Sequence, residues 1–137
     1  MKTLSNANHK AEIVRRLSAI GPASRRRWGT MTVAQMICHL SDAFRAAIGE
    51  KAAEPVKNRY SGPFMRWAAL WLPFKWPHGV PTVPECDANA CGTRPADFES
   101  DKRELLELLE RFTTAPRDSG LQPHPFFGVM SEKECGC

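Results

Sequence analysis

Apolar residues recur with a helical period in several segments of the chain, and no segment alternates apolar and polar residues as a half-buried strand does. The first segment runs from about Asn8 to Ile20 and is followed by Gly21 and Pro22, which favour the end of a helix. Its apolar positions, which share one face of a helical wheel, are Ile13, Val14, Leu17 and Ile20. The pattern predicts an amphipathic first helix.

The second segment carries the most complete set of helix signals. Gln35 follows Thr32 by three residues, the spacing of a capping box in which the two side chains satisfy backbone N–H groups of the first turn. Met31 and Met36 stand at the positions of a hydrophobic staple, and Gly49 lies near the expected end. The apolar stripe predicted for this helix consists of Val33, Met36, Ile37, Leu40, Phe44, Ala47 and Ile48.

The second half of the chain predicts two further helices and the start of another. A short helix is expected from Pro63 to Leu72, and a proline-rich connection follows it up to Pro95. A long helix is expected from about Ala96 to Phe112, and Ser131 with Glu134 forms a second capping-box pattern. With no internal repeat and no domain boundary, residues 1–137 are expected to form one all-α domain.

The long helix at residues 96–112 combines an apolar stripe with a charged face. Its apolar positions are Phe98, Leu105, Leu108, Leu109 and Phe112. Its carboxylates are Glu99, Glu104, Glu107 and Glu110, and the expected cationic partners on the same helix are Lys102, Arg103 and Arg111. We expect these charges to form a solvated surface rather than a catalytic cluster.

Composition and charge exclude several classes of protein. The net charge is +4, and its densest cluster, at residues 25–27, has no aromatic residues interleaved with it. A solvated loop is therefore favoured over a phosphate or nucleic-acid contact. No apolar run reaches the length of a membrane span, and none near the N-terminus reaches that of a signal peptide. We expect a cytoplasmic protein without a nucleic-acid or membrane partner.

Five cysteines, at positions 38, 86, 91, 135 and 137, suggest reduced thiols rather than a disulfide framework. The spacings of the paired cysteines do not match the usual zinc motifs. Cys38 lies within the second predicted helix, where it is expected to pack against other side chains. It cannot act as a nucleophile with His39 as its base, because adjacent helical residues do not face each other.

His39 is the histidine with the strongest claim to a function, since it lies in the best-specified helix at the edge of its apolar stripe. Two interpretations stay open: a partly buried histidine hydrogen-bonded to a neighbour, or a metal ligand that projects into a helical bundle. Asp42, about one turn on, could orient the ring or act as a second ligand. His9 is expected at the surface, whereas His78 and His124 each adjoin a proline in a loop and are left open.

Four stretches, at residues 28–45, 76–85, 95–112 and 124–134, resemble in matching order the DinB-like (DinB/YfiT) metalloenzyme superfamily, in a bacterial branch of uncharacterised proteins. The resemblance implies an up-down-down-up four-helix bundle that holds a divalent metal, zinc or nickel, with three histidines. His39, in MICHLSD, matches the ligand of the second helix. The other two ligands are implied one turn apart on the last helix. Relatives of known activity are S-transferases and isomerases that use low-molecular-weight thiols and small-molecule substrates.

The sequence departs from this family pattern after Glu134. Cys135 stands where the family has tryptophan, and the printed sequence ends at Cys137 without the implied histidine pair. We therefore expect a truncated member that lacks most of its last helix, binds metal loosely and is inactive as written. Its uncovered apolar residues are expected to leave it a loose monomer or to cause self-association. A frameshift, an early stop codon and a fragmentary gene model stay open as origins. The alternative function is a metal-free helical binding or oligomerisation module.

Overall fold

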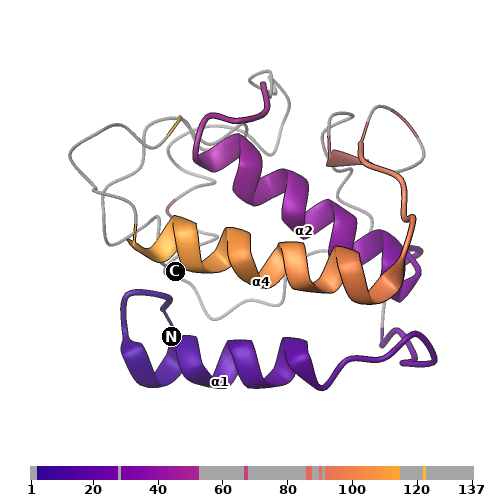
Figure 1. Cartoon of the computed structure of the whole chain (residues 1–137), viewed down its shortest axis with the longest axis horizontal. Coiled ribbons are helices and arrows are strands. Elements are labelled where there is room, and N and C mark those ends of the chain that lie inside the picture. The colour runs from indigo at the N-terminus through magenta and orange to yellow at the C-terminus, as the bar shows by residue number, and fades with distance from the viewer. Residues whose placement is uncertain are drawn as a thin grey trace.

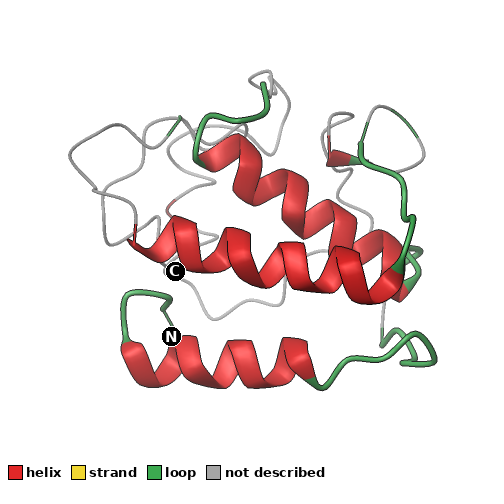
Figure 2. Cartoon of the chain, viewed as in Figure 1, coloured by secondary structure: helices red, strands yellow, loops and turns green. Residues whose placement is uncertain are grey.

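A computed structural model describes residues 3–27, 29–52, 67, 86–87, 90, 92–114 and 122. Within these residues the chain forms three helices, which are α1 (Ala7–Ser18), α2 (Val33–Ala47) and α4 (Phe98–Thr114) (Figure 1). Helices and their connecting loops account for the described segments, which contain no strand (Figure 2). None of the described helices has both the length and the apolar character that a bilayer crossing requires. The all-α prediction is confirmed for this part of the chain.

The ends of α1 differ from the prediction by one or two residues. The side-chain oxygen of Asn6 accepts hydrogen bonds from the backbone N–H groups of Asn8, at 3.0 Å, and His9, at 3.2 Å, so the helix begins at Ala7. At the other end, the Ile20 N–H donates to the Leu17 carbonyl three residues back, at 3.1 Å. This tighter turn ends α1 at Ser18, before Gly21 is reached.

Both ends of α2 use local hydrogen bonds that the sequence signalled. The Thr32 N–H donates to Gln35 Oε1 at 2.9 Å and the Gln35 N–H donates to Thr32 Oγ1 at 3.2 Å, which confirms the capping box. Gly49 has a φ of +82°, and its N–H donates to the Ala46 carbonyl. The Glu50 N–H donates to the Arg45 carbonyl at 2.8 Å, which completes a Schellman motif.

Helix α4 begins and ends two residues later than predicted. The Ser100 N–H donates to the Asp97 side chain at 2.8 Å, so Asp97 caps the first turn and the helix begins at Phe98. At its end, Thr113 and Thr114 stay helical and donate their hydroxyl protons to carbonyls of the preceding turn.

Contacts along the helices establish their relative directions. Lys102 on α4 donates to the carbonyl of Ile20 after α1, at 3.2 Å, whereas Lys10 on α1 pairs with Glu110 on α4, at 2.6 Å. The residue numbers at these contacts fall along α1 as they rise along α4, so these two helices are antiparallel. Between α2 and α4 the residue numbers of the contacting pairs rise together, from the pair of Cys38 and Asp101 to the pair of Glu50 and Arg111. Helices α2 and α4 therefore run in the same direction and α1 runs in the opposite one (Figure 1).

The described core lies mainly between α2 and α4. Ile37, Leu105 and Leu109 are at most 1% exposed, and the Phe44 and Phe112 rings have centroids 5.2 Å apart. The apolar prediction for α4 is confirmed at the positions that are buried, which are Leu105, Leu108, Leu109 and Phe112. At these positions a helical period alone identified the residues that are removed from water.

The stripe predicted for α2 is only partly the buried face. Of its members only Ile37 is buried, while Leu40 and Phe44 are half-buried. The fully buried positions of α2 are Ile37, Cys38, Ser41, Asp42 and Ala46. This rotation of the buried face is possible because Asp42, the charged residue among them, obtains hydrogen-bond partners when it leaves water.

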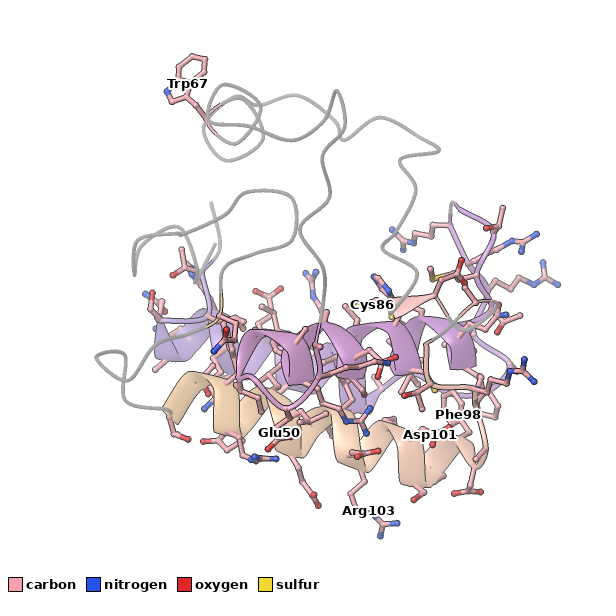
Figure 3. All side chains as sticks on the ribbon, turned by 90° about the horizontal axis from the view of Figure 1, so that it is seen from above. Glu50, Trp67, Cys86, Phe98, Asp101 and Arg103 are labelled. Carbon is pink, nitrogen blue, oxygen red and sulfur yellow. The ribbon has the colours of Figure 1, made fainter. Side chains whose placement is uncertain are left out.

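Several predicted elements lie outside the described residues. These are the helix at 63–72 except Trp67, most of the proline-rich connection, the start of a helix at Ser131, His78 and His124. Trp67 has half of its surface exposed and lies apart from the three helices in Figure 3.

Candidate functional site

The ring of His39 is oriented by a backbone carbonyl. His39 lies half-buried on α2, and its Nδ1 atom is 2.8 Å from the carbonyl oxygen of Cys86. Because a carbonyl oxygen can only accept, Nδ1 is the donor, and the neutral ring carries its proton there and an electron pair on Nε2. Cys86 is itself buried and lies on the side of α2 away from Asp101 (Figure 3).

His9 has the opposite tautomer. Its Nδ1 atom accepts a hydrogen bond from the backbone N–H of Thr3 at 3.1 Å, so in the neutral ring the proton is on Nε2. This half-buried histidine, predicted to be a surface residue, is tied to the chain just before α1. The structure therefore distinguishes two helical histidines by which ring nitrogen carries the proton.

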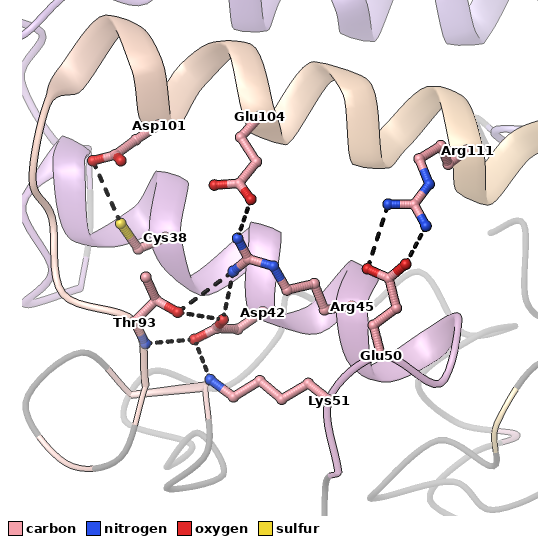
Figure 4. A network of polar contacts seen from close by, with 9 residues as sticks. All are labelled: Cys38, Asp42, Arg45, Glu50, Lys51, Thr93, Asp101, Glu104 and Arg111. Carbon is pink, nitrogen blue, oxygen red and sulfur yellow. Dashed lines mark hydrogen bonds and ion pairs between the residues drawn. The ribbon is translucent and has the colours of Figure 1, made fainter.

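Asp42, one turn after His39 on α2, is a buried carboxylate with four hydrogen-bond donors around it (Figure 4). Its Oδ2 atom accepts from the Thr93 N–H and pairs with Lys51 Nζ, both at 2.7 Å. Its Oδ1 atom accepts from the Thr93 hydroxyl at 2.7 Å and from Arg45 at 3.0 Å. With only 1% of its surface exposed, the carboxylate depends on these donors to replace water.

The charge state of Asp42 follows from these partners. Burial by itself would raise the pKa of the carboxyl group, but the hydrogen bonds from Lys51 and Thr93 and the charge of Lys51 lower the pKa below its ordinary value. Asp42 is therefore ionised at neutral pH. The Schellman turn at Gly49 makes the Lys51 contact possible, because it reverses the chain directly after α2.

Arg45 extends this cluster to α4. Its guanidinium binds Asp42 and Glu104 and donates to Thr93 Oγ1 at 3.4 Å (Figure 4). Burial alone would lower the pKa of Arg45, but the two carboxylates raise the pKa above its ordinary value. We call Asp42, Arg45, Lys51, Thr93 and Glu104 the Asp42 cluster. It joins α2 both to α4 and to the segment that precedes α4.

The charged face of α4 is exposed as predicted, but its partners are partly different. Lys102 pairs with Glu99 on the same helix at 3.0 Å, which agrees with the prediction. Glu104 instead binds Arg45 of α2, and Glu110 binds Lys10 of α1. These two carboxylates therefore connect helices. Helical spacing identified the exposed face but could not show which neighbouring helix lies beside it.

A closed turn connects the Asp42 cluster with His39. The Asp87 carbonyl accepts from the Ala90 N–H at 2.9 Å and from the Gly92 N–H at 2.8 Å. A Cβ atom on Gly92 would lie 2.6 Å from the carbonyl carbon of Asp87, closer than real Cβ contacts allow. The contact therefore requires glycine, and it brings together Asp87 and Gly92, the chain neighbours of Cys86 and Thr93.

Cys38 is a buried thiol, as predicted. Its Sγ atom donates to Asp101 Oδ2 at 3.8 Å, and 2% of its surface is exposed. Burial, followed by the negative charges of Asp101 and Asp42, raises the pKa of this thiol to about 11. The thiolate needed for nucleophilic attack is therefore scarce at neutral pH. Cys86 is a second buried cysteine.

The described residues contain one side chain that fits a metal ligand, rather than a complete metal site. The His39 ring has the orientation that metal-binding histidines adopt, with Nδ1–H on a backbone carbonyl. No group of three or more His, Cys, Asp or Glu residues in the described segments is arranged to hold a metal. Asp42, considered from the sequence as a ring partner or second ligand, has both oxygens engaged by Thr93, Arg45 and Lys51. The Cys86 carbonyl orients the ring.

The other residues around this site could hardly be predicted from sequence patterns. Arg45 and Lys51 follow Asp42 by three and nine residues, and their pairing depends on the turn at Gly49. Thr93 is distant in the sequence and lies in a stretch without helical periodicity. The one sequence feature that pointed to this cluster was Asp42 itself, an aspartate one helical turn after His39.

Comparisons of the chain with protein-family models, with curated proteins and with solved structures find no match in any of the three. The resemblance to DinB-like proteins is therefore carried by the four stretches of sequence alone. It stays a prediction.

Proposed function

We propose that the chain is a DinB-like helical domain in which His39 provides one ligand of a divalent metal, zinc or nickel, for thiol-dependent chemistry on a small molecule. One observation carries this proposal: the hydrogen bond of 2.8 Å from His39 Nδ1 to the Cys86 carbonyl. Such a bond fixes the tautomer in which Nε2 has the electron pair that a metal binds.

The directions of the helices support the same proposal. Helix α1 runs opposite to α4, and α2 runs parallel to α4. An up-down-down-up bundle has this order in its first three long helices, with the second and third parallel and the first opposite to both. The fourth long helix of that bundle would begin at Ser131.

The proposal also limits how tightly residues 1–137 can bind the metal. The resemblance implies two further histidines on the last helix, and the 137 residues contain no such pair after Ser131. Three protein ligands are the usual number in a catalytic zinc site. We therefore propose that these residues by themselves bind the metal weakly and are inactive.

Metal titration tests this proposal directly. Zinc or nickel is titrated into the 137-residue protein and into variants with His39→Ala or His9→Ala, and bound metal is measured by calorimetry and after dialysis. Weak binding that is lost with His39→Ala and retained with His9→Ala is the expected result. Metal binding that is unchanged in His39→Ala contradicts the assignment of His39 as a ligand. Stoichiometric metal retained after dialysis contradicts the proposed weak affinity.

The second candidate function is a metal-free binding or oligomerisation module. The observation that favours it is α1, whose apolar residues Ile13, Val14 and Leu17 are only half-buried. Sedimentation of the metal-free protein distinguishes the two candidates. A concentration-dependent dimer that persists in chelator, together with no His39-dependent metal binding, would favour the module.

A further inference from the structure

Asp42 and His39 lie one turn apart on α2, and the same short segment contacts both of them. We propose that Asp42 is a positioning residue for His39, which acts through Thr93 and the backbone hydrogen bond between Gly92 and Asp87 to hold the Cys86 carbonyl against the imidazole ring. This inference rests on the proposed function for its purpose, since it names the group that presents Nε2 to a ligand. Its test uses the ring itself and needs no metal.

The first step is the anchoring of Thr93. Asp42 receives both the backbone N–H and the hydroxyl of Thr93 at 2.7 Å, so the main chain is held as well as the side chain. Lys51 and Arg45 hold the carboxylate from the other side. A buried, ionised carboxylate with four donors is a rigid anchor, because each oxygen has partners in fixed directions.

The second step is the transmission of this position along the backbone. The Gly92 N–H bonds to the Asp87 carbonyl at 2.8 Å, and the space beside Gly92 does not admit a Cβ atom. A displacement of Thr93 must therefore move its neighbour Gly92 and, across the turn, Asp87. Asp87 is adjacent in the chain to Cys86, whose carbonyl is the acceptor for His39.

The third step is the effect on the ring. The segment meets α2 at two points, with Thr93 on Asp42 and Cys86 on His39, and these points are one helical turn apart. When the Asp42 contact is lost, the carbonyl is free to move from the position in which it accepts the Nδ1 proton. The competing explanation is that the buried side chain of Cys86, 4% exposed, holds the carbonyl without help from Asp42.

Nuclear magnetic resonance of the metal-free 137-residue protein tests the proposal. Long-range ¹H–¹⁵N spectra of the imidazole rings distinguish the two neutral tautomers, and single histidine substitutions assign the signals. In the parent protein His39 is expected with its proton on Nδ1 and His9 with its proton on Nε2. The two rings serve as opposite references in one spectrum.

Variants along the three steps give a graded expectation. Asp42→Ala should shift the two His39 nitrogen signals towards each other, because both tautomers become populated, and Thr93→Val should do so to a smaller extent. Thr93→Ser, which retains the hydroxyl, should restore the parent spectrum. Glu50→Gln is the matched control, since Glu50 pairs with Arg111 away from the segment. The signals of His9 should not change in any of these variants.

A folding check keeps the test decisive. Where Asp42→Ala lowers the helical circular dichroism, Thr93→Val and Gly92→Ala decide, because they leave the buried carboxylate in place. An unchanged His39 tautomer in these folded variants overturns the proposal and assigns the carbonyl position to Cys86 burial. A tautomer change in a protein without His39-dependent zinc binding supports the positioning role and contradicts the proposed function instead. The two failures are therefore distinguishable.

Discussion

Helices α1 and α2 both carry an amphipathic pattern of residues, yet the structure buries them to different depths. None of the twelve residues of α1 is buried, whereas α2 buries five residues, two of them polar. Helix α1 is joined to α4 by charged groups, namely Lys10 with Glu110 and Lys102 with the carbonyl after α1. Helix α2 packs against α4 through the apolar core and through the Asp42 cluster.

The difference shows that an apolar stripe predicts an amphipathic helix but not how deeply that helix is buried. Stability is distributed unevenly in proteins, and segments with few buried contacts open at lower cost than the core. We therefore expect α1 to open and close locally while the pair of α2 and α4 remains folded.

The largest expected effect is the loss of a large side chain between α2 and α4. Leu105→Ala removes a side chain with no exposed surface and should lower the free energy of unfolding by about 2–5 kcal/mol. The matched substitution Leu17→Ala on α1 should cost clearly less, because Leu17 is half-buried. Chemical denaturation followed by circular dichroism measures both. Equal losses at the two positions would show that α1 belongs to the same cooperative core.

The second prediction concerns acid stability and the polar part of the α2 contact. The pKa of Asp42 is lower in the folded protein than in the unfolded chain, so its contribution to stability is fully present above the unfolded pKa. That contribution is lost as the pH falls through the folded pKa. Asp42→Asn should lower the free energy of unfolding at neutral pH by about 1–3 kcal/mol.

The pH dependence provides the control for this second prediction. The parent protein should lose stability on acidification more steeply than the Asp42→Asn variant, whose curve should be flatter below the ordinary pKa of an aspartate. Denaturation midpoints across the acidic range measure this. Parallel curves for the two proteins would mean that Asp42 has the same pKa in the folded and unfolded states.

These two regions also show what the sequence could predict. Features that depend on residues close together in the sequence could be predicted. Thr32 with Gln35 predicted the start of α2, and the helical period of the leucines in α4 predicted its buried face. The buried face of α2 was missed because a charged residue, Asp42, is buried in it. That burial depends on Thr93, 51 residues away in the sequence, and a helical pattern contains no information about it.

His39 likewise has one property that neighbouring residues predict and one that depends on a residue distant in the sequence. Its place in a helix at the edge of an apolar stripe could be predicted from residues within two turns of it. The hydrogen bond that orients its ring comes from Cys86, in a proline-rich stretch where no periodicity gives a register to the chain. The side chain could thus be selected from sequence, whereas its tautomer required the fold.

The smallest expected effect concerns the other ion pair between α2 and α4. Glu50 follows α2 and binds the Arg111 guanidinium on α4, just as Arg45 on α2 binds Glu104 on α4 (Figure 4). The Glu50 side chain is 41% exposed and the Arg111 side chain is 57% exposed. Glu50 raises the pKa of Arg111, which is charged at neutral pH with or without this partner. Water and salt screen such pairs, and ordering two long side chains offsets most of the attraction. Glu50→Gln should therefore leave the denaturation midpoint unchanged within error at 0.15 M salt or above, whereas Asp42→Asn shifts it under the same conditions. A Glu50→Gln shift as large as that of Asp42→Asn would mean that the number of ion pairs between α2 and α4, rather than the burial of Asp42, determines the stability of this contact.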